Sequence, residues 1–243
     1  MRVAVVSDVH ANMAALEAVL RSADAAGGIE AVWTLGDIVG YGPDPNEVVR
    51  ELRRLHAVAV AGNHDRAATG QMGVEEFNPA AADAALWTKG QLGPGERGWL
   101  HALPLTHEGD AFTLAHGSLR DPVWEYLLRP DQAAAQFARQ RTPFSLVGHS
   151  HLPFVVEEQP EGPRFRPARD GETVALGQTR LILNPGSVGQ PRDGDPRASW
   201  ILYDAAAAAV TFHRVEYDIA ATQERMRAAG LDRWLIERLA HGR

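Results

Sequence analysis

Residues 144–151 read FSLVGHSH, a short apolar run that ends abruptly in Gly148, His149, Ser150 and His151. The run over 144–147 predicts a buried β-strand. Two imidazoles directly after a buried strand are well placed to bind a ligand, because histidine is a common metal ligand and proton carrier. The stretch therefore indicates a functional site at the end of a strand.

Four further apolar runs end in the same way. The runs at 3–6, 31–35, 57–61 and 112–115 each predict a strand, and helices predicted over 12–22 and 45–55 separate the first three. Strands that alternate with helices form parallel sheets, whose carboxyl ends share one edge where ligands bind. We therefore expect the polar residues after five strands to converge. They are Asp8-Val9-His10, Gly36-Asp37, Gly62-Asn63-His64-Asp65, His116, and His149 with His151.

The residue types at these strand ends predict a centre that holds two metal ions. The candidate ligands are Asp8, His10, Asp37, Asn63, His116, His149 and His151. Seven ligands are too many for one tetrahedral zinc site, but they suit two ions that share a bridging carboxylate. A mixed imidazole and carboxylate set favours Mn, Fe, Co, Ni or Zn over Ca or Mg. Two metals roughly 3.5–4 Å apart are the usual arrangement for in-line displacement at phosphorus.

Each motif alone has an ordinary structural explanation. An aspartate at a strand end commonly stabilises a turn, and Gly-Asp is frequent in loops. The ordered set, with each member after a strand, is poorly explained by chance, and so we interpret it as one site. The remaining histidines stand alone and are expected to be surface or core residues: His56, His101, His107, His213 and His241.

The composition excludes several other classes of protein. The chain has 243 residues, 45% of them hydrophobic, which is enough for one large domain with a sizeable core. It has no cysteine, so disulfide frameworks, thiolate metal sites and cysteine nucleophiles are excluded. The net charge is −7, and polymeric nucleic acid is therefore not the expected partner. The apolar run at the N-terminus is too short for a signal peptide or a membrane span, which predicts a cytoplasmic protein.

The rest of the chain predicts more helices and a second sheet. Helices are expected from residue 78 to about 92, around 96–103 and over 130–140. The last third contains short runs between turns, which predict a mainly antiparallel second sheet, at 154–158, 164–168, 173–175, 181–183, 200–203 and 210–215. Helices over 218–230 and 231–240 follow. We expect a single domain over residues 1–243, with residues 218–241 as C-terminal helices.

At these motifs the sequence resembles the calcineurin-like metallophosphoesterase superfamily, and most of all its small bacterial and archaeal phosphodiesterase branch. The match covers residues 1 to about 190 and includes Gly40-Tyr41-Gly42-Pro43 and Asn184-Pro185-Gly186-Ser187-Val188-Gly189. The resemblance implies a fold of the α/β (α+β) class. This fold is a four-layer αββα sandwich with two mixed β-sheets and a dimetal site on the strand edge.

The resemblance also implies a role for each motif residue. Asp8, His10 and His151 would hold one metal ion, Asn63, His116 and His149 would hold the other, and Asp37 would bridge them. A hydroxide between the metals would attack phosphorus in line. His64 would protonate the leaving group. Asp65 would orient His64, and its charge would raise the pKa of that imidazole.

Departures from the family pattern bear on the substrate. Protein phosphatases and diadenosine tetraphosphate hydrolases carry a phosphate-gripping Arg shortly after Gly-Asp, whereas residues 38–42 here read Ile-Val-Gly-Tyr-Gly. Their Gly-Asn-His-Glu is Gly-Asn-His-Asp here, and both differences weaken a protein-phosphatase interpretation. Arg120 and Arg192 are the candidate substrate-binding residues, and Arg66 is a third arginine near a motif. Each could instead form a surface or structural ion pair, and Tyr41 could equally be a packed loop residue.

These features predict a dinuclear metal-dependent phosphoesterase that acts as a phosphodiesterase on a small soluble phosphate ester. Manganese is the favoured metal, with Fe, Zn, Ni or Co as alternatives. A phosphomonoesterase or nucleotide phosphatase is the second interpretation. A non-catalytic protein-interaction scaffold is disfavoured by the complete ligand set, and a nuclease by the acidic charge. The sequence makes no prediction for the oligomeric state.

Overall fold

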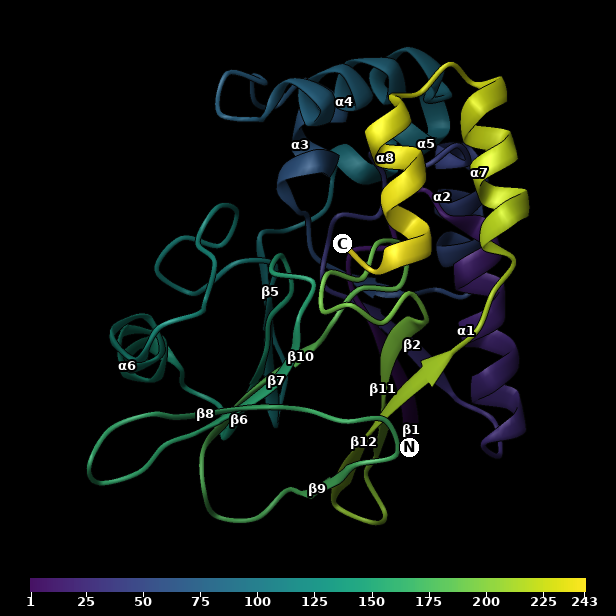
Figure 1. Cartoon of the computed structure of the whole chain (residues 1–243). Coiled ribbons are helices and arrows are strands. Elements are labelled where there is room, and N and C mark those ends of the chain that lie inside the picture. The colour runs from purple at the N-terminus through teal and green to yellow at the C-terminus, as the bar shows by residue number, and fades with distance from the viewer.

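The computed structural model describes all residues 1–243 and contains two six-stranded β-sheets that pack against each other (Figure 1). In spatial order, the first sheet consists of β3 (Val58–Ala59), β2 (Ala31–Thr34), β1 (Arg2–Val6), β11 (Ala198–Asp204), β12 (Ala209–Val215) and β9 (Thr173–Ala175). The second consists of β4 (Thr106–Glu108), β5 (Phe112–Ala115), β6 (Phe144–Leu146), β10 (Leu181–Pro185), β7 (Pro153–Glu157) and β8 (Arg164–Pro167).

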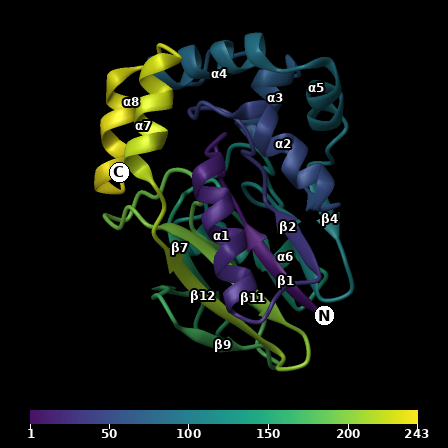
Figure 2. The same ribbon diagram turned by 90° about the vertical axis from the view of Figure 1, so that its right-hand side faces the viewer.

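Helices cover the two outer faces and one end of this pair of sheets (Figures 1 and 2). They are α1 (Met13–Ala25), α2 (Pro45–Arg54), α3 (Asn63–Thr69), α4 (Pro79–Gln91), α5 (Pro94–His101), α6 (Pro130–Arg139), α7 (Ile219–Ala228), α8 (Arg233–Glu237) and the 3₁₀ helix η1 (Arg238–His241). Helices α1 and α2 pack on the first sheet, and α6 packs on the second. This is the predicted αββα order of layers. No helix is both long enough and apolar enough to cross a bilayer.

The alternation of side chains along β1 explains how one strand serves two layers. Val3 and Val5 point into the core between the sheets, where they meet residues such as Phe112. Ala4 and Val6 point the other way and pack in the cluster that contains Leu16 of α1. Successive side chains of a strand face opposite sides of the sheet. A strand whose side chains are all apolar, such as β1, is therefore suited to a sheet that is covered on both faces.

The strands of the last third join both sheets, which differs from the prediction of a mainly antiparallel second sheet. Strands β9, β11 and β12 extend the first sheet, and β11 pairs antiparallel with β1. Strand β10 lies in the second sheet and pairs in parallel with β6 but antiparallel with β7. The difference arises because apolar alternation marks a strand, whereas its partner is chosen by contacts between distant parts of the chain.

A group of helices lies over the carboxyl ends of β1, β2 and β3. Helices α4, α7 and α8 gather at this end of the molecule, whereas the N-terminus lies at the other end (Figures 1 and 2). Met226 of α7 and Leu235 of α8 pack in one buried cluster with Ala81 of α4 and with Tyr41. Because the C-terminal helices share this cluster with loops of the sheet, we keep the prediction of one domain.

Candidate metal centre

The structure brings all seven predicted metal ligands together at the carboxyl edge of the strands. Each is buried, with at most 3% of its surface exposed. They follow five different strands: Asp8 and His10 after β1, Asp37 after β2, Asn63 after β3, His116 after β5, and His149 and His151 after β6. The convergence predicted from the parallel strand order is therefore observed.

One set of ligand atoms consists of Asp8, His10 and His151. The Nε2 atoms of His10 and His151 lie 3.1 Å apart. Nε2 of His151 lies 3.2 Å from Oδ1 of Asp8, and Nε2 of His10 lies 3.9 Å from the same oxygen. Three potential ligand atoms therefore face one small volume.

A second set consists of Asn63, His116 and His149. Nε2 of His116 lies 3.0 Å from Nδ1 of His149 and 3.1 Å from Oδ1 of Asn63. Asp37 lies between the two sets, because its Oδ2 is 3.4 Å from Nε2 of His116 and 3.7 Å from Nε2 of His10. One carboxylate oxygen is thus within reach of both sets.

Backbone carbonyls fix the orientation of three of the imidazoles. The Nδ1 atoms of His10, His116 and His151 lie 3.2, 2.9 and 2.5 Å from backbone carbonyl oxygens. A carbonyl only accepts hydrogen bonds, so Nδ1 carries the proton and Nε2 presents its lone pair to the centre. The lone pairs of His10 and His151 consequently face each other, an arrangement that a shared cation stabilises. Two nitrogens bound about 2.1 Å from one metal at tetrahedral or right angles are roughly 3.0–3.4 Å apart.

In both Asp8 and Asp37, one carboxylate oxygen accepts hydrogen bonds and the other faces the imidazoles. Oδ2 of Asp8 accepts hydrogen bonds from the Ser7 hydroxyl at 2.6 Å and the His149 backbone N–H at 3.1 Å. Oδ1 of Asp8 is buried without a hydrogen-bond partner and faces the imidazoles. In Asp37, Oδ1 accepts from the His64 backbone N–H at 2.9 Å, and Oδ2 faces the imidazoles. Each carboxylate is oriented by one oxygen and offers the other, which fits a metal ligand.

Burial and like charges also favour cations at this centre. Burial, followed by the carboxylates of Asp8 and Asp65, raises the pKa of Asp37 well above its usual value. Burial would also raise the pKa of Asp8, but His151 reverses this effect and brings that pKa below its usual value. Burial lowers the pKa of His151 to about 4. The imidazoles are therefore neutral and able to bind metal, while the buried carboxylates need positive charge nearby.

The backbone at the centre is unusual. Asp8, His10, Asp37, His149 and His151 have φ angles of 52°, 48°, 49°, 65° and 60°. Positive φ is uncommon outside glycine, and such residues cluster at functional sites. Five of the seven candidate ligands thus share a left-handed conformation, which turns their side chains out of the strand direction towards a common point.

Gly36 and Gly62 allow the loops after β2 and β3 to touch. A Cβ on Gly62 would lie 2.1 Å from Oδ1 of Asp37, and a Cβ on Gly36 would lie 2.6 Å from the backbone nitrogen of Gly62. Only glycine permits this approach. The contact places Asp37 beside Asn63 at the start of α3.

The predicted pairing of His64 with Asp65 is wrong. The buried Asp65 carboxylate accepts hydrogen bonds from the backbone N–H groups of Ile38, Val39 and Gly62, and no hydrogen bond or ion pair joins it to His64. The reason is local: Asp65 is the third residue of α3, from which an acidic side chain turns back to the helix N-terminus. Burial, followed by the charge of Arg192, lowers the pKa of His64 well below its usual value instead of raising it.

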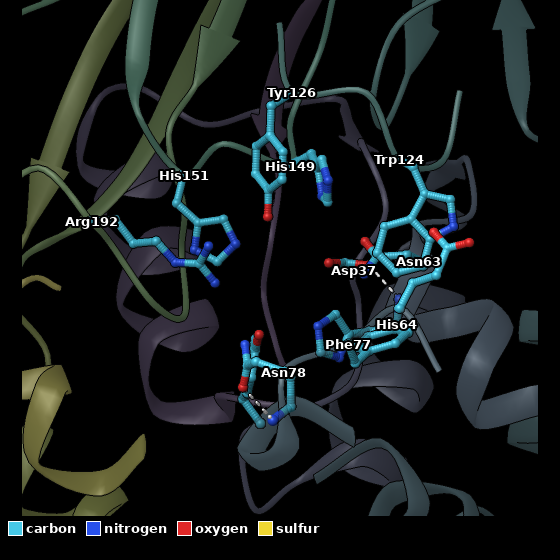
Figure 3. A pocket seen from close by; sticks show the side chains of 13 residues that line it. Asp37, Asn63, His64, Phe77, Asn78, Trp124, Tyr126, His149, His151 and Arg192 are labelled. Atoms are coloured by element: carbon cyan, nitrogen blue, oxygen red, sulfur yellow. Dashed lines mark hydrogen bonds between the residues drawn. The ribbon is translucent and has the colours of Figure 1, made fainter. Parts of the chain in front are cut away.

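A cavity of about 80 Å³ opens in front of the candidate ligands (Figure 3). Asp37, Asn63, His64, His149 and His151 line it, together with Tyr41, Arg192 and residues from the loops described below. Tyr41 is buried between His10 and His64, with ring centroids 4.6 and 4.4 Å away.

Of the three arginines near the motifs, Arg192 lines the cavity, and Arg120 and Arg66 do not. Arg192 lines it, and its Nη2 donates to Oε1 of Gln190 at 2.9 Å without an ion-pair partner. Arg120 does not line the cavity and forms an ion pair with Glu125. Arg66 is half-buried and also does not line the cavity. The roles assigned to Arg120 and Arg192 from the sequence stay predictions.

Sequence reasoning missed six other residues that line the cavity, Glu76, Phe77, Asn78, Ala81, Trp124 and Tyr126. They follow no strand and match no motif that we used. A signal was nevertheless present, because the loop at residues 116–129 is long and has no regular secondary structure. Such loops are commonly functional.

Comparisons with known proteins identify the family of the chain. Residues 1–207 match the family model of the calcineurin-like phosphoesterase superfamily domain. The chain is 40% identical over 246 residues to the uncharacterized protein MJ0912 of Methanocaldococcus jannaschii, with 99% of this chain and 98% of that protein covered.

Solved structures also match the whole chain. The metallophosphoesterase from Sphaerobacter thermophilus is 46% identical with a TM-score of 0.90, and the match covers 100% of this chain and 99% of that one. The hypothetical protein PH1004 from Pyrococcus horikoshii is 24% identical with a TM-score of 0.78 over 100% and 98% of the two chains, and it shares the fold. From the motifs, the fold and the match over residues 1–207, we conclude that the chain belongs to the calcineurin-like phosphoesterase superfamily and is a metal-dependent phosphoric ester hydrolase.

Proposed function

We propose that this protein is a phosphodiesterase that uses two divalent metal ions and acts on a small phosphate ester. The observation that carries the proposal is the position of Asp37 between two sets of ligand atoms, within 3.4 and 3.7 Å of an imidazole from each. One carboxylate shared by two imidazole-containing sets is what a pair of bridged cations requires.

The assignment of ligands follows the two sets. Asp8, His10 and His151 would hold one ion, Asn63, His116 and His149 would hold the other, and Asp37 would bridge them. Nitrogen and oxygen donors in this mixture suit Mn, which we favour, and also Fe, Zn, Ni or Co. Seven protein ligands for two ions leave coordination positions open for water and substrate.

The metals would supply a water molecule activated as nucleophile and would neutralise charge on the phosphoryl oxygens. Arg192 is the residue that we assign to bind a phosphoryl oxygen, because its guanidinium lines the cavity and has no carboxylate partner. His64 is assigned to donate a proton to the leaving oxygen, since its side chain lines the cavity beside the candidate ligands. A bound phosphate anion beside this imidazole would offset burial and raise its pKa.

Two features favour a diester over a monoester. Arg192 is the only lysine or arginine that lines the cavity, and a diester carries less negative charge than a monoester. The volume of about 80 Å³ is also far below the roughly 300–1,000 Å³ of pockets for drug-sized ligands, which favours a small substrate. A phosphomonoesterase or nucleotide phosphatase is the alternative, favoured if Arg192 and the metals together suffice to bind a dianion.

The test is the hydrolysis of bis-p-nitrophenyl phosphate beside p-nitrophenyl phosphate. The protein is stripped with a chelator, and Mn, Fe, Co, Ni, Zn or Mg is then restored. We expect activity to return with a transition metal and to be higher on the diester. A faster reaction on the monoester would support the alternative, and inactivity with every metal would contradict both.

Variants of the ligands connect activity to the centre. Asp37→Asn and His149→Ala should each lower kcat at least about 100-fold, since even the loss of a residue that only supports a ligand costs about 10–100-fold. Metal analysis should find two ions per chain in the unchanged protein and fewer in the variants. His107→Ala is the matched control, because His107 is an exposed histidine on β4. Undiminished turnover in either ligand variant would refute the assignment.

A further inference from the structure

The loop between β5 and α6 is held in one shape by its own polar groups. The Ser118 hydroxyl accepts hydrogen bonds from the backbone N–H groups of Arg120 and Asp121, both at 3.1 Å. The Asp121 carboxylate accepts one from the backbone N–H of Trp124 at 3.1 Å. The ion pair between Arg120 and Glu125 closes the loop on itself. The loop begins at the candidate ligand after β5, so this network fixes its position relative to the metal centre.

Two aromatic side chains of the loop lie beside the cavity, and a third approaches them from the segment before α4 (Figure 3). Tyr126 stacks on the candidate ligand His149, with ring centroids 3.9 Å apart and planes at 23°. Trp124 and Phe77 meet edge to face at 5.1 Å. Phe77 meets His64 in the same manner at 4.9 Å. We call Phe77, Trp124 and Tyr126 the aromatic rim, and it runs along the cavity from His64 to His149.

Trp124 and Tyr126 belong to none of the hydrophobic clusters, whereas one side of Phe77 packs against the cluster of Tyr41 and Ala81. Tyr126 is 42% exposed, and Trp124 and Phe77 are half-buried. The side chain of Tyr126 points into the cavity from the side opposite Asn78 (Figure 3). Aromatic residues that serve only stability are mostly buried, whereas exposed apolar groups gathered around a cavity mark a binding surface.

We propose that the aromatic rim binds a planar aromatic group of the phosphate ester by stacking, and so determines which esters the site accepts. The inference rests on the proposed phosphoesterase function and specifies its substrate class. The phosphate would lie against the metal centre and Arg192, with a nucleobase or an aryl ring against Trp124 and Tyr126. Arg120 then acts by holding the loop through Glu125 and has no contact with phosphate.

The experiment measures binding of phosphonates, whose carbon–phosphorus bond resists hydrolysis. Benzylphosphonate, an acyclic adenine nucleoside phosphonate and butylphosphonate are titrated into metal-loaded protein by calorimetry. We expect the two aromatic ligands to bind more tightly than butylphosphonate. Trp124→Ala should weaken the aromatic ligands roughly 5- to 150-fold, the range that removal of one stacking partner produces. It should change the affinity for butylphosphonate less than about twofold. The two aromatic ligands distinguish a preference for nucleosides from one for simple aryl esters.

Further variants separate stacking from support of the loop. Trp124→Phe and Tyr126→Phe keep an aromatic ring and should retain most of the preference. Leu86→Ala, which removes an exposed side chain of α4 outside the rim, should retain all of it. If Trp124→Ala lowers the affinity for the aromatic ligands and for butylphosphonate by the same factor, Trp124 only supports the loop. The absence of any aromatic preference in the unchanged protein would also overturn the inference.

Hydrolysis of bis-p-nitrophenyl phosphate by the same preparations distinguishes the two proposals. Metal-dependent hydrolysis without an aromatic preference in binding would reject the rim and leave the phosphodiesterase proposal in place. An aromatic preference that Trp124→Ala removes, in a protein that hydrolyses no ester with any metal, would support the rim and reject the proposed function.

Discussion

Replacement of Asp65 by alanine should destabilise the fold, because this carboxylate holds two loops of the metal centre together. It is fully buried and accepts hydrogen bonds from the backbone N–H groups of Ile38, Val39 and Gly62 at 3.0, 3.1 and 2.9 Å. In Asp65→Ala these three donors stay buried without an acceptor. A buried unsatisfied donor costs about 1–3 kcal/mol, so the lower end alone gives a loss of about 3 kcal/mol in the free energy of unfolding.

Thermal unfolding of the metal-free protein measures this loss without a contribution from bound metal. For a chain of this size about 1 kcal/mol shifts Tm by roughly 2–4 °C, so we expect Asp65→Ala to melt about 6–12 °C lower. Asp65→Asn keeps one acceptor oxygen and should show a smaller decrease. Asp131→Ala is the control, because that aspartate is exposed and its only ion pair is with the exposed Arg129, an arrangement that contributes little.

Two results would refute this reasoning. If Asp65→Ala unfolds at the same temperature as the unchanged protein, the three hydrogen bonds do not stabilise the loops. Alternatively, Asp65→Asn could keep its stability but lose hydrolysis. In that case Asp65 would act on His64, as the sequence first suggested, and holding the two loops together would not be its main role.

Three further predictions follow from other parts of the molecule. Arg192→Ala should lower kcat/KM for bis-p-nitrophenyl phosphate at least about tenfold, since hydrogen bonds to charged groups contribute about 1.5–3 kcal/mol. Arg120→Ala should lower kcat/KM less than about fivefold. Equal losses in the two variants would contradict the assignment of Arg192 as the arginine that binds phosphate. Gly62→Ala would place a methyl group 2.1 Å from a carboxylate oxygen of Asp37, the candidate bridging ligand. Metal analysis or circular dichroism should therefore show that the variant has lost metal or has failed to fold. A folded variant with its full metal content would show that the close approach is dispensable. A hydrogen bond from Arg197 holds the pKa of Asp195 below its usual 3.8, so its contribution to stability is present above about pH 4 and is lost as pH falls further. Urea unfolding should therefore show that Asp195→Asn destabilises the protein near neutral pH but has little effect at about pH 2.

The position of the candidate site could be predicted because it depends on strand order alone. Five apolar runs followed by ligand-type residues were visible in the sequence, and alternation with helices implied one shared edge. His116 and His149 meet for this reason, although they are far apart along the chain. The family resemblance supplied the layered fold, which the structure and the comparisons confirm.

Features that depend on side-chain direction or on distant pairing could not be predicted in this way. Asp65 follows His64 directly in sequence, but the start of α3 turns its carboxylate towards Gly62. Trp124 and Tyr126 reach the cavity through the shape of one loop, which no periodic pattern encodes. The division of the late strands between the two sheets depends on contacts that form only in the complete fold.

The left-handed backbone at five of the candidate ligands has a consequence for how inactive forms of the protein should be made. Alanine scanning assumes that only the side chain is lost, yet alanine in this conformation costs roughly 1 kcal/mol of its own. Asparagine adopts the same conformation readily. Asn exchanges at Asp8 or Asp37 therefore keep the chain path and the size of the side chain and change only one donor atom. A catalytically silent protein made in this way, with its cavity walls in place, would be suited to trapping whatever ester the cell provides.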